Sequence, residues 1–237
     1  MTLFLLILSV FLGIFVQSVA GFGLALVMMP ILSTVMGVNA AAPLVAIIAT
    51  VAEFTILIRY REALNLRAIW RLSLAAVLGV PLGVWLVRWL DANITLTALG
   101  CVVIGYALYG LLRLRLPELK QPGWAYFFGF AAGLLSGAYN TSGPAYVIYG
   151  NCRRWEPAEF KGNLQGAFLV SGLTSIASHW LAGNFTGQIG QYFLLSLPMM
   201  GLALWLGGRI DKRLNPHTFR QIVLWLLIVL GLRLIWQ

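Results

Sequence analysis

Charged side chains are scarce in this sequence. Asp, Glu, Lys and Arg make up 10% of its 237 residues, whereas soluble domains carry about 25%. With 60% hydrophobic residues, this composition excludes a sizeable soluble domain and predicts an all-α polytopic membrane protein whose main partner is the lipid bilayer. The net charge of +9 comes from sixteen Lys and Arg residues that cluster between apolar segments. It therefore indicates topogenic loops and not nucleic-acid binding.

Cysteine and histidine are also rare, with two residues of each. Two cysteines cannot build a disulfide framework, and no Cys/His spacing typical of a metal site occurs. The sequence lacks a P-loop and a nucleophile elbow. We therefore expect no metal, no cofactor, no ATPase component and no enzyme activity. The N-terminus has no basic region and no small-residue cleavage site, so residues 1–19 are interpreted as mature structure and not as a signal peptide.

Apolar segments alternate with short charged loops along the whole chain, which is expected to form one transmembrane domain, 1–237. About eight segments are recognised, at 2–36, 39–58, 68–88, 95–112, 123–150, 162–181, 187–207 and 218–236. The first would be about 50 Å long as one helix, against ~30 Å for the bilayer core, and the fifth also exceeds a single span. Both are predicted to be broken helices or re-entrant hairpins.

The chain repeats itself at an offset of 120 residues. Glycine, tryptophan and aspartate identities recur without a gap, as in Gly13 and Gly133, Gly23 and Gly143, Trp85 and Trp205, and Asp91 and Asp211. Residues 1–117 and 121–237 are therefore predicted to be two repeats. Each repeat would contain one broken helix or hairpin and three transmembrane helices.

Basic residues fall in opposite loops of the two repeats. Four arginines flank the loop after the second segment, at Arg59, Arg61, Arg67 and Arg71, whereas the loop after the sixth segment has no charge. The turn after the first segment is uncharged, and the one after the fifth is basic. By the positive-inside rule the repeats are inverted, with both termini outside. Eight simple spans with both termini on one side are the alternative topology.

The two long segments are interrupted at equivalent positions, Gln17–Gly23 and Gly137–Gly143. In the second break, Ser142 is a candidate N-cap, and the proline two positions later suits the first turn of a new helix. A helix that starts inside the membrane aims unpaired N–H groups and a partial positive charge at its surroundings, which suits an anion. A glycine kink in a transmembrane helix is the alternative interpretation.

We expect a substrate site where the two breaks meet, because irregular backbone at that depth is tolerated only inside protein or along a cavity. The candidate substrate-binding residues are Gln17, Ser18, Gly21, Gly23, Asn140, Thr141, Ser142, Gly143, Asn163 and Gln165. Glu53 is the candidate ion-coupling residue, because a carboxyl in mid-segment is costly and by default functional. A structural carboxyl bonded to a neighbouring helix is the alternative.

The sixth segment also carries hydroxyl residues at helical spacing, Ser171, Thr174, Ser175 and Ser178. They either line a pathway or bond neighbouring helices. His179, near the outer end of the same segment, is interpreted as an interfacial residue.

Three stretches, Gly21–Pro30, Gly133–Val147 and Trp155–Lys161, resemble the TauE/SafE family of membrane transporters, and the resemblance covers nearly the whole chain in order. It implies secondary transport of sulfite or small organosulfonates, often outward. The expected partners are a small anion and a coupling proton or sodium ion, and a homo-oligomer is compatible with the sequence. The expected location is the bacterial inner membrane, as a multi-pass protein.

Two other functions share part of this evidence. A passive anion channel would have every sequence feature described above, and only transport against a gradient distinguishes it. An intramembrane enzyme would need a nucleophile with a base, or metal ligands, at one depth. His179 and His217 lie on opposite sides in the expected topology, which disfavours an enzyme.

Overall fold

The computed structural model describes residues 2–112, 116–210 and 216–236, and these residues form ten α-helices and one 3-10 turn, without a β-strand. The first half contains α1 (Thr2–Ala20), α2 (Leu24–Met36), α3 (Val38–Tyr60), the turn η1 (Arg61–Ala63), α4 (Leu66–Trp89) and α5 (Ala92–Leu111). The second contains α6 (Trp124–Tyr139), α7 (Gly143–Cys152), α8 (Pro157–Leu181), α9 (Gly187–Ile210) and α10 (Pro216–Ile235).

Five helical stretches are long and apolar enough to cross a bilayer, at Leu3–Ala20, Val38–Ala63, Leu66–Trp89, Ala92–Leu111 and Gly187–Ile210. The prediction of an all-helical polytopic membrane protein is thereby confirmed. Among the described residues α8 is long enough to span as well, with 25 residues, but it is not among these five. Its buried positions include serine, asparagine, glutamine and histidine, and it packs against α3, α4, α6 and α7. The face of α8 that carries these residues points into the bundle, whereas its other face is exposed at Leu173 and Trp180.

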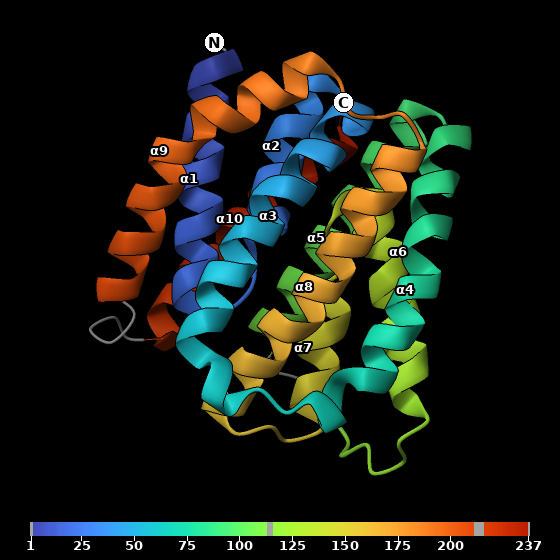
Figure 1. Cartoon of the computed structure of the whole chain (residues 1–237), viewed down its shortest axis with the longest axis vertical. Coiled ribbons are helices and arrows are strands. Elements are labelled where there is room, and N and C mark those ends of the chain that lie inside the picture. Colours follow the sequence, from blue (N-terminus) through green and yellow to red (C-terminus); the bar gives the residue numbers. More distant parts are fainter. Residues whose placement is uncertain (1, 113–115, 211–215, 237) are drawn as a thin grey trace.

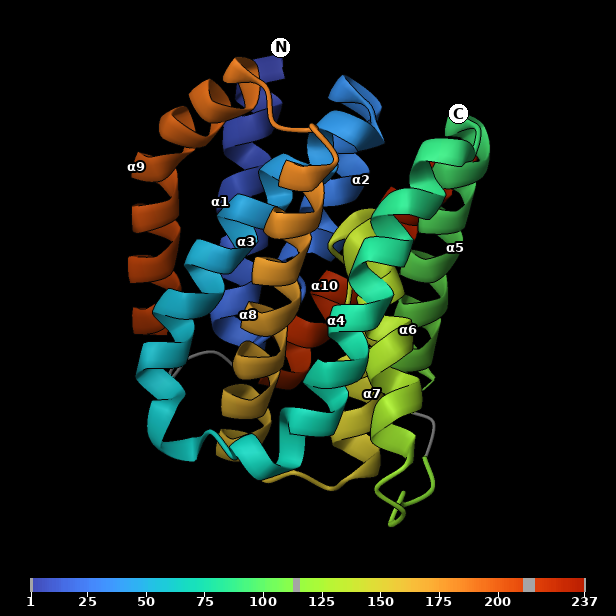
Figure 2. The same ribbon diagram turned by 45° about the vertical axis from the view of Figure 1, so that its right-hand side comes forward.

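Both overlong apolar segments are broken, as predicted. The first divides into α1 and α2 at Gly21–Gly23, and the other into α6 and α7 at Asn140–Ser142. In each case the two pieces pack against each other as a hairpin. The hairpin of α1 and α2 opens at the end of the bundle where both termini lie, and the hairpin of α6 and α7 opens at the opposite end (Figures 1 and 2).

The helices of the second half follow those of the first at an interval of about 120 residues, so α6 to α10 correspond in order to α1 to α5. The contacts between the halves are reciprocal. α4 packs on α6 and α9 packs on α1, while α3 pairs with α8 and α5 with α10. The two halves are therefore interleaved and share one core.

The basic loops gather at the end of the bundle opposite the termini. The connections from α3 to α4 and from α7 to α8 both lie there, as does the segment before α6 (Figures 1 and 2). Hydrogen bonds tie these connections together. The Asn65 amide donates to Glu159 at 3.2 Å, and Arg153 donates to the carbonyl of Leu119 at 2.6 Å.

Glycines bring α4 and α6 together with their backbones almost touching. A Cβ atom added at Gly133 would overlap the carbonyl oxygen of Ala76, and one added at Gly83 would overlap that of Leu134. Apolar association has little driving force between helices in lipid, so such close backbone contact is a main source of stability. This contact also joins the two halves of the chain.

Replacing Gly133 by alanine is expected to destabilise the protein by about 1–3 kcal/mol, because the new methyl group has no space on the α4 side. The matched control is Gly105→Ala on α5, where an added Cβ meets nothing within 4 Å. Thermal unfolding in detergent measures both. The packing argument is wrong if the two variants unfold at the same temperature.

Candidate functional site

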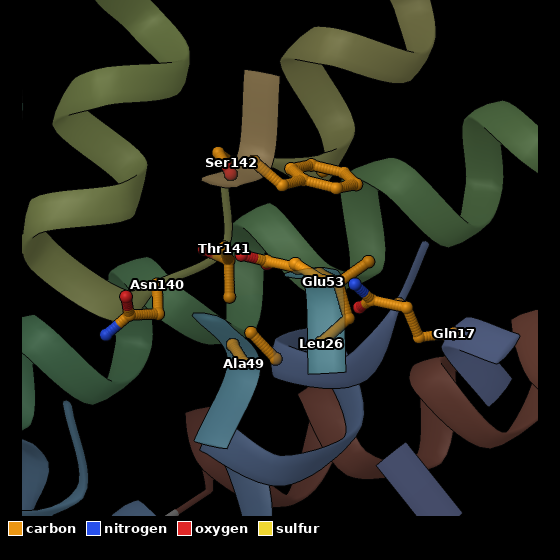
Figure 3. A pocket seen from close by; sticks show the side chains of 11 residues that line it. Gln17, Leu26, Ala49, Glu53, Asn140, Thr141 and Ser142 are labelled. Carbon is orange, nitrogen blue, oxygen red and sulfur yellow. The ribbon is translucent and has the colours of Figure 1, made fainter. Parts of the chain in front are cut away.

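The two breaks meet at one small buried pocket (Figure 3). Its lining comes from both hairpins and from the helices α3 and α8, and consists of Gln17, Gly23, Ala25, Leu26, Ala49, Glu53, Asn140, Thr141, Ser142, Gly143 and Phe168. The cavity measures about 20 Å³, which is space for about one water molecule. No lysine or arginine is part of this lining. The backbone N–H groups at the starts of α2 and α7 contribute positive potential in the pocket itself.

The first break depends on two glycines. Gly21 and Gly23 have φ values of 82° and 108°, a region that other residues rarely adopt. These turns end α1 and begin α2 within three residues. The side chain of Gln17 folds back over the break, and its Oε1 accepts a hydrogen bond from the Leu24 N–H at 3.1 Å. One N–H of the first turn of α2 is thus paired, and the turn still faces the pocket through Ala25 and Leu26.

Asn140 turns the chain at the second break, with φ at 52°. Asparagine tolerates this left-handed conformation better than most residues. Its side-chain amide donates to the carbonyl of Ala42 at 2.6 Å, which fixes the break against α3. α7 then begins at Gly143 with Pro144 in its first turn, as the sequence predicted.

The expected N-cap bond from Ser142 does not form. Ser142 occupies the N-cap position, but its φ and ψ of −63° and −17° are helical, and its hydroxyl makes no capping hydrogen bond. An N-cap serine needs an extended backbone to aim its oxygen at the N–H groups of the first turn. The start of α7 is therefore uncapped, and its first N–H groups remain available to a ligand.

Glu53 reaches the pocket from α3. Its side chain is only 7% exposed, and its Oε2 atom has no hydrogen-bond partner among the described residues. The Gln17 side chain is a hydrogen-bonding neighbour of the carboxyl group. Gly172 on α8 faces the carboxyl group, since a Cβ added there would lie 3.1 Å from Oε2. One carboxyl oxygen of Glu53 is therefore buried without a hydrogen bond and is open to a ligand or a proton.

Thr141 is the second polar group without a partner. It is 1% exposed, and its hydroxyl makes no hydrogen bond within the described part of the chain. Its side chain and that of Glu53 approach each other in the pocket (Figure 3). A buried hydroxyl without a partner costs about 1–3 kcal/mol, so two such groups at one cavity favour a site that binds a polar ligand.

Four of the ten candidate substrate-binding residues lie outside the pocket lining. Gln165 supports the first break from α8, because its amide donates to the carbonyl of Gly21 at 2.7 Å and accepts from Gln17 at 3.3 Å. Gly21 itself lies under the side chain of Lys161. Asn163 bonds the backbone N–H of Asn65 at 2.8 Å, which is in the loop after η1.

Ser18 is the fourth, and it faces α9, where a Cβ on Gly207 would overlap its side chain. The other six candidates line the pocket together with Glu53. Ala25 and Leu26, which lie just after Gly23, also line it and were not among the candidates, and neither were two residues further away, Ala49 and Phe168. Each lies about one helical turn from a candidate, Ala49 before Glu53 and Phe168 after Gln165, and that spacing was the signal available in the sequence.

Replacing Gln165 by methionine is expected to destabilise the protein by about 1–3 kcal/mol, because the buried Gly21 carbonyl loses its donor while the volume of the side chain is kept. Gln188→Met, at an exposed glutamine of α9, is the matched control. The measurements are thermal unfolding and amide hydrogen exchange at residues 21–24. Equal unfolding temperatures and equal exchange in the two variants would contradict a supporting role for Gln165.

Comparison with known proteins agrees with this architecture. A family model described as "Sulfite exporter TauE/SafE" matches residues 5–234. A "Probable sulfite/organosulfonate exporter TauE" of Cupriavidus necator is 30% identical over 232 residues, covering 92% of this chain and 88% of that protein. A "Probable inner membrane transporter protein TsaS" of Comamonas testosteroni is 27% identical over 179 residues, covering 72% of this chain and 74% of that protein. No solved structure gives a significant match.

The family is one of transporters, so the interpretation as an intramembrane enzyme is wrong. The helices long enough to span a bilayer and the relatives together identify a multi-pass protein of the bacterial inner membrane. The chain belongs to the TauE/SafE family of membrane transporters.

Proposed function

We propose that the protein is a secondary active transporter that moves a small sulfur oxyanion or organosulfonate by alternating access. The observation that carries this proposal is the buried pocket that receives the starts of two half-helices from opposite ends of the bundle. The names of the relatives direct the choice of substrate to sulfite and organosulfonates. The proposed partners are thus a small anion and a coupling ion.

An anion would be bound mainly by backbone dipoles. The first turns of α2 and α7 direct N–H groups and the positive ends of their helix dipoles toward the pocket. The hydroxyl of Thr141 would donate one further hydrogen bond, and Asn140 and Ser142 lie next to it. A sulfonate or sulfite group presents three oxygens, which matches donors arriving from two sides.

The pocket, at about 20 Å³, is smaller than such an anion needs. We infer that this conformation is closed, and that the hairpins must separate before an anion can enter. A pocket too small to pass an anion in this conformation favours a transporter over a permanently open channel, because such a channel requires a continuous path.

The proposed movement is a rotation of one half of the chain relative to the other. We propose that they are inverted repeats, supported by the corresponding helices about 120 residues apart and by the hairpins that open at opposite ends. The end that carries the basic loops would be cytoplasmic, with both termini outside. Rocking one half against the other would expose the pocket alternately to the two sides.

Glu53 would couple the anion to a proton. An ionised carboxylate in the pocket repels an anion, whereas a protonated one can donate a hydrogen bond to it. Binding of the proton and binding of the anion therefore favour each other, and by linkage the effect is reciprocal. The unpartnered Oε2 is the atom that would carry this proton.

Thr141→Val is expected to weaken anion binding about 10- to 100-fold, because one hydrogen bond to a charged ligand is lost. Stability should not fall, and should rise by up to about 1–3 kcal/mol, since the buried hydroxyl has no partner among the described residues. Thr34→Val, which removes a hydroxyl bonded to the Ile31 carbonyl away from the pocket, is the control. Calorimetry and thermal shift with sulfite, thiosulfate, sulfoacetate and taurine measure binding. If none of these anions stabilises the wild-type protein, the anion site is refuted.

Glu53→Gln is expected to abolish sulfite transport driven by a pH gradient in proteoliposomes and to leave sulfite binding intact, because an amide can still donate to the anion. The control is Glu62→Gln, at an exposed glutamate of η1. Full transport driven by the pH gradient in the Glu53 variant would rule out its coupling role.

A further inference from the structure

One face of α8 is polar and buried along half the length of the helix. Ser171, Ser175 and His179 follow one another at intervals of four residues, which places them on the same face. They are 1%, 0% and 3% exposed, respectively. His179, which was expected near the outer interface, is buried within the protein close to the C-terminal end of α8. Three buried polar side chains in a row are costly inside a membrane protein, and intramembrane polar chains commonly mark ion or proton pathways.

The inner end of this face reaches Glu53. Gly172 follows Ser171, and its missing side chain leaves room for the Glu53 carboxyl and for the Thr50 hydroxyl. Ser171 shares a hydrogen bond of 2.6 Å with the hydroxyl of Tyr146, which is fully buried on α7. The distance along the helix from Gly172 to His179 is about 10 Å.

The outer end of this face leads from the buried His179 to the half-buried Asn184 and the exposed Arg88. The Asn184 amide nitrogen lies 2.8 Å from Nδ1 of His179, and the Asn184 oxygen accepts from Arg88 at 2.8 Å. Because Arg88 fixes the amide oxygen, the amide nitrogen is the donor, and Nδ1 is the acceptor. The proton of the neutral ring is then on Nε2, which is buried and has no partner among the described residues.

We propose that this face of α8, from His179 through Ser175 to Gly172, is the route by which a proton passes between the outer side of the membrane and Glu53. The proposal rests on the proton coupling proposed above. His179 would relay the proton by releasing one from Nε2 toward Ser175 and taking one up at Nδ1 when the Asn184 amide moves off that nitrogen. Successive polar groups are about 6 Å apart along the helix, a gap that one water molecule can bridge.

The neighbours of this route suit a proton better than an anion. Ser175 donates to the carbonyl of Ser136 on α6 at 3.2 Å, so the route is closely packed at its middle. The titratable and charged groups that face it are Glu53 on α3, Tyr146 on α7 and Arg88 on α4. An anion would have to displace these packed helices, whereas a proton needs only a water molecule between successive polar groups.

The test compares His179→Gln and Ser175→Ala with the wild-type protein in proteoliposomes, with radiolabelled sulfite and an internal pH dye. Ser196→Ala is the control, since Ser196 is a buried serine of α9 that also donates to a backbone carbonyl. Two quantities are measured: net sulfite transport with its proton flux under a pH gradient, and sulfite exchange without a gradient. During exchange only the protein with both sulfite and a proton bound moves between its two states. Exchange therefore does not require the proton to leave Glu53.

Both route variants are expected to lose about tenfold or more of net transport and proton flux while exchange stays unchanged. Unchanged net transport in both would overturn the route. Loss of net transport and exchange together in folded protein would also overturn it, because these residues would then serve the anion. If His179→Gln fails to fold, Ser175→Ala decides. If the wild-type protein exchanges sulfite but moves no protons, Glu53 has no coupling role and the proposed proton route is refuted. The proposed anion site is not affected by that result.

Discussion

The backbone that leaves the helix inside the membrane must find partners within the protein, and the arrangement of this chain depends on that requirement. Each unpaired backbone group in that environment costs several kcal/mol. Gln17 pairs the Leu24 N–H, Gln165 pairs the Gly21 carbonyl, and Asn140 holds the second break against α3. These long polar side chains must lie at the depth of the breaks, so the helices that carry them lie inside the bundle. α8 therefore has a polar face that is enclosed by the other helices.

The polar groups near the breaks fall into two classes by their hydrogen bonds. The amides of Gln17, Gln165 and Asn140 are engaged and hold the backbone in place. Glu53 Oε2 and the Thr141 hydroxyl are buried without a partner in the described part of the chain. The first class preorganises the pocket, so that binding does not have to order it. The second class is available to a ligand, which would recover the free energy lost when these groups were buried.

The sequence predicted those features that disturb an apolar pattern. Glycines, prolines and three adjacent polar residues inside hydrophobic runs located both breaks, and a lone carboxyl in mid-segment located Glu53. The orientation of side chains was not predictable, because helical spacing does not say which neighbour a face meets. Ser18 therefore faces α9, Phe168 lines the pocket, and His179 is buried. Whether the Ser142 hydroxyl caps α7 depends on φ and ψ of that single residue, and a sequence pattern does not determine these angles.

The arrangement of helices repeats between the two halves of the chain, but the polar side chains at the candidate site do not. Helices and helix contacts correspond between the halves, yet the residue 120 positions after Glu53 is Leu173, which is 55% exposed. Similarly, the polar face of α8 with His179 corresponds to α3, where residue 59 takes the equivalent place and is an arginine bonded to the Leu204 carbonyl. In the proposed alternating access, the equivalent helix arrangements would let one half rock against the other with similar energy in both states. A single carboxyl with access along one helix would give the two states different proton affinities, which a driven transporter needs and a symmetric site could not provide.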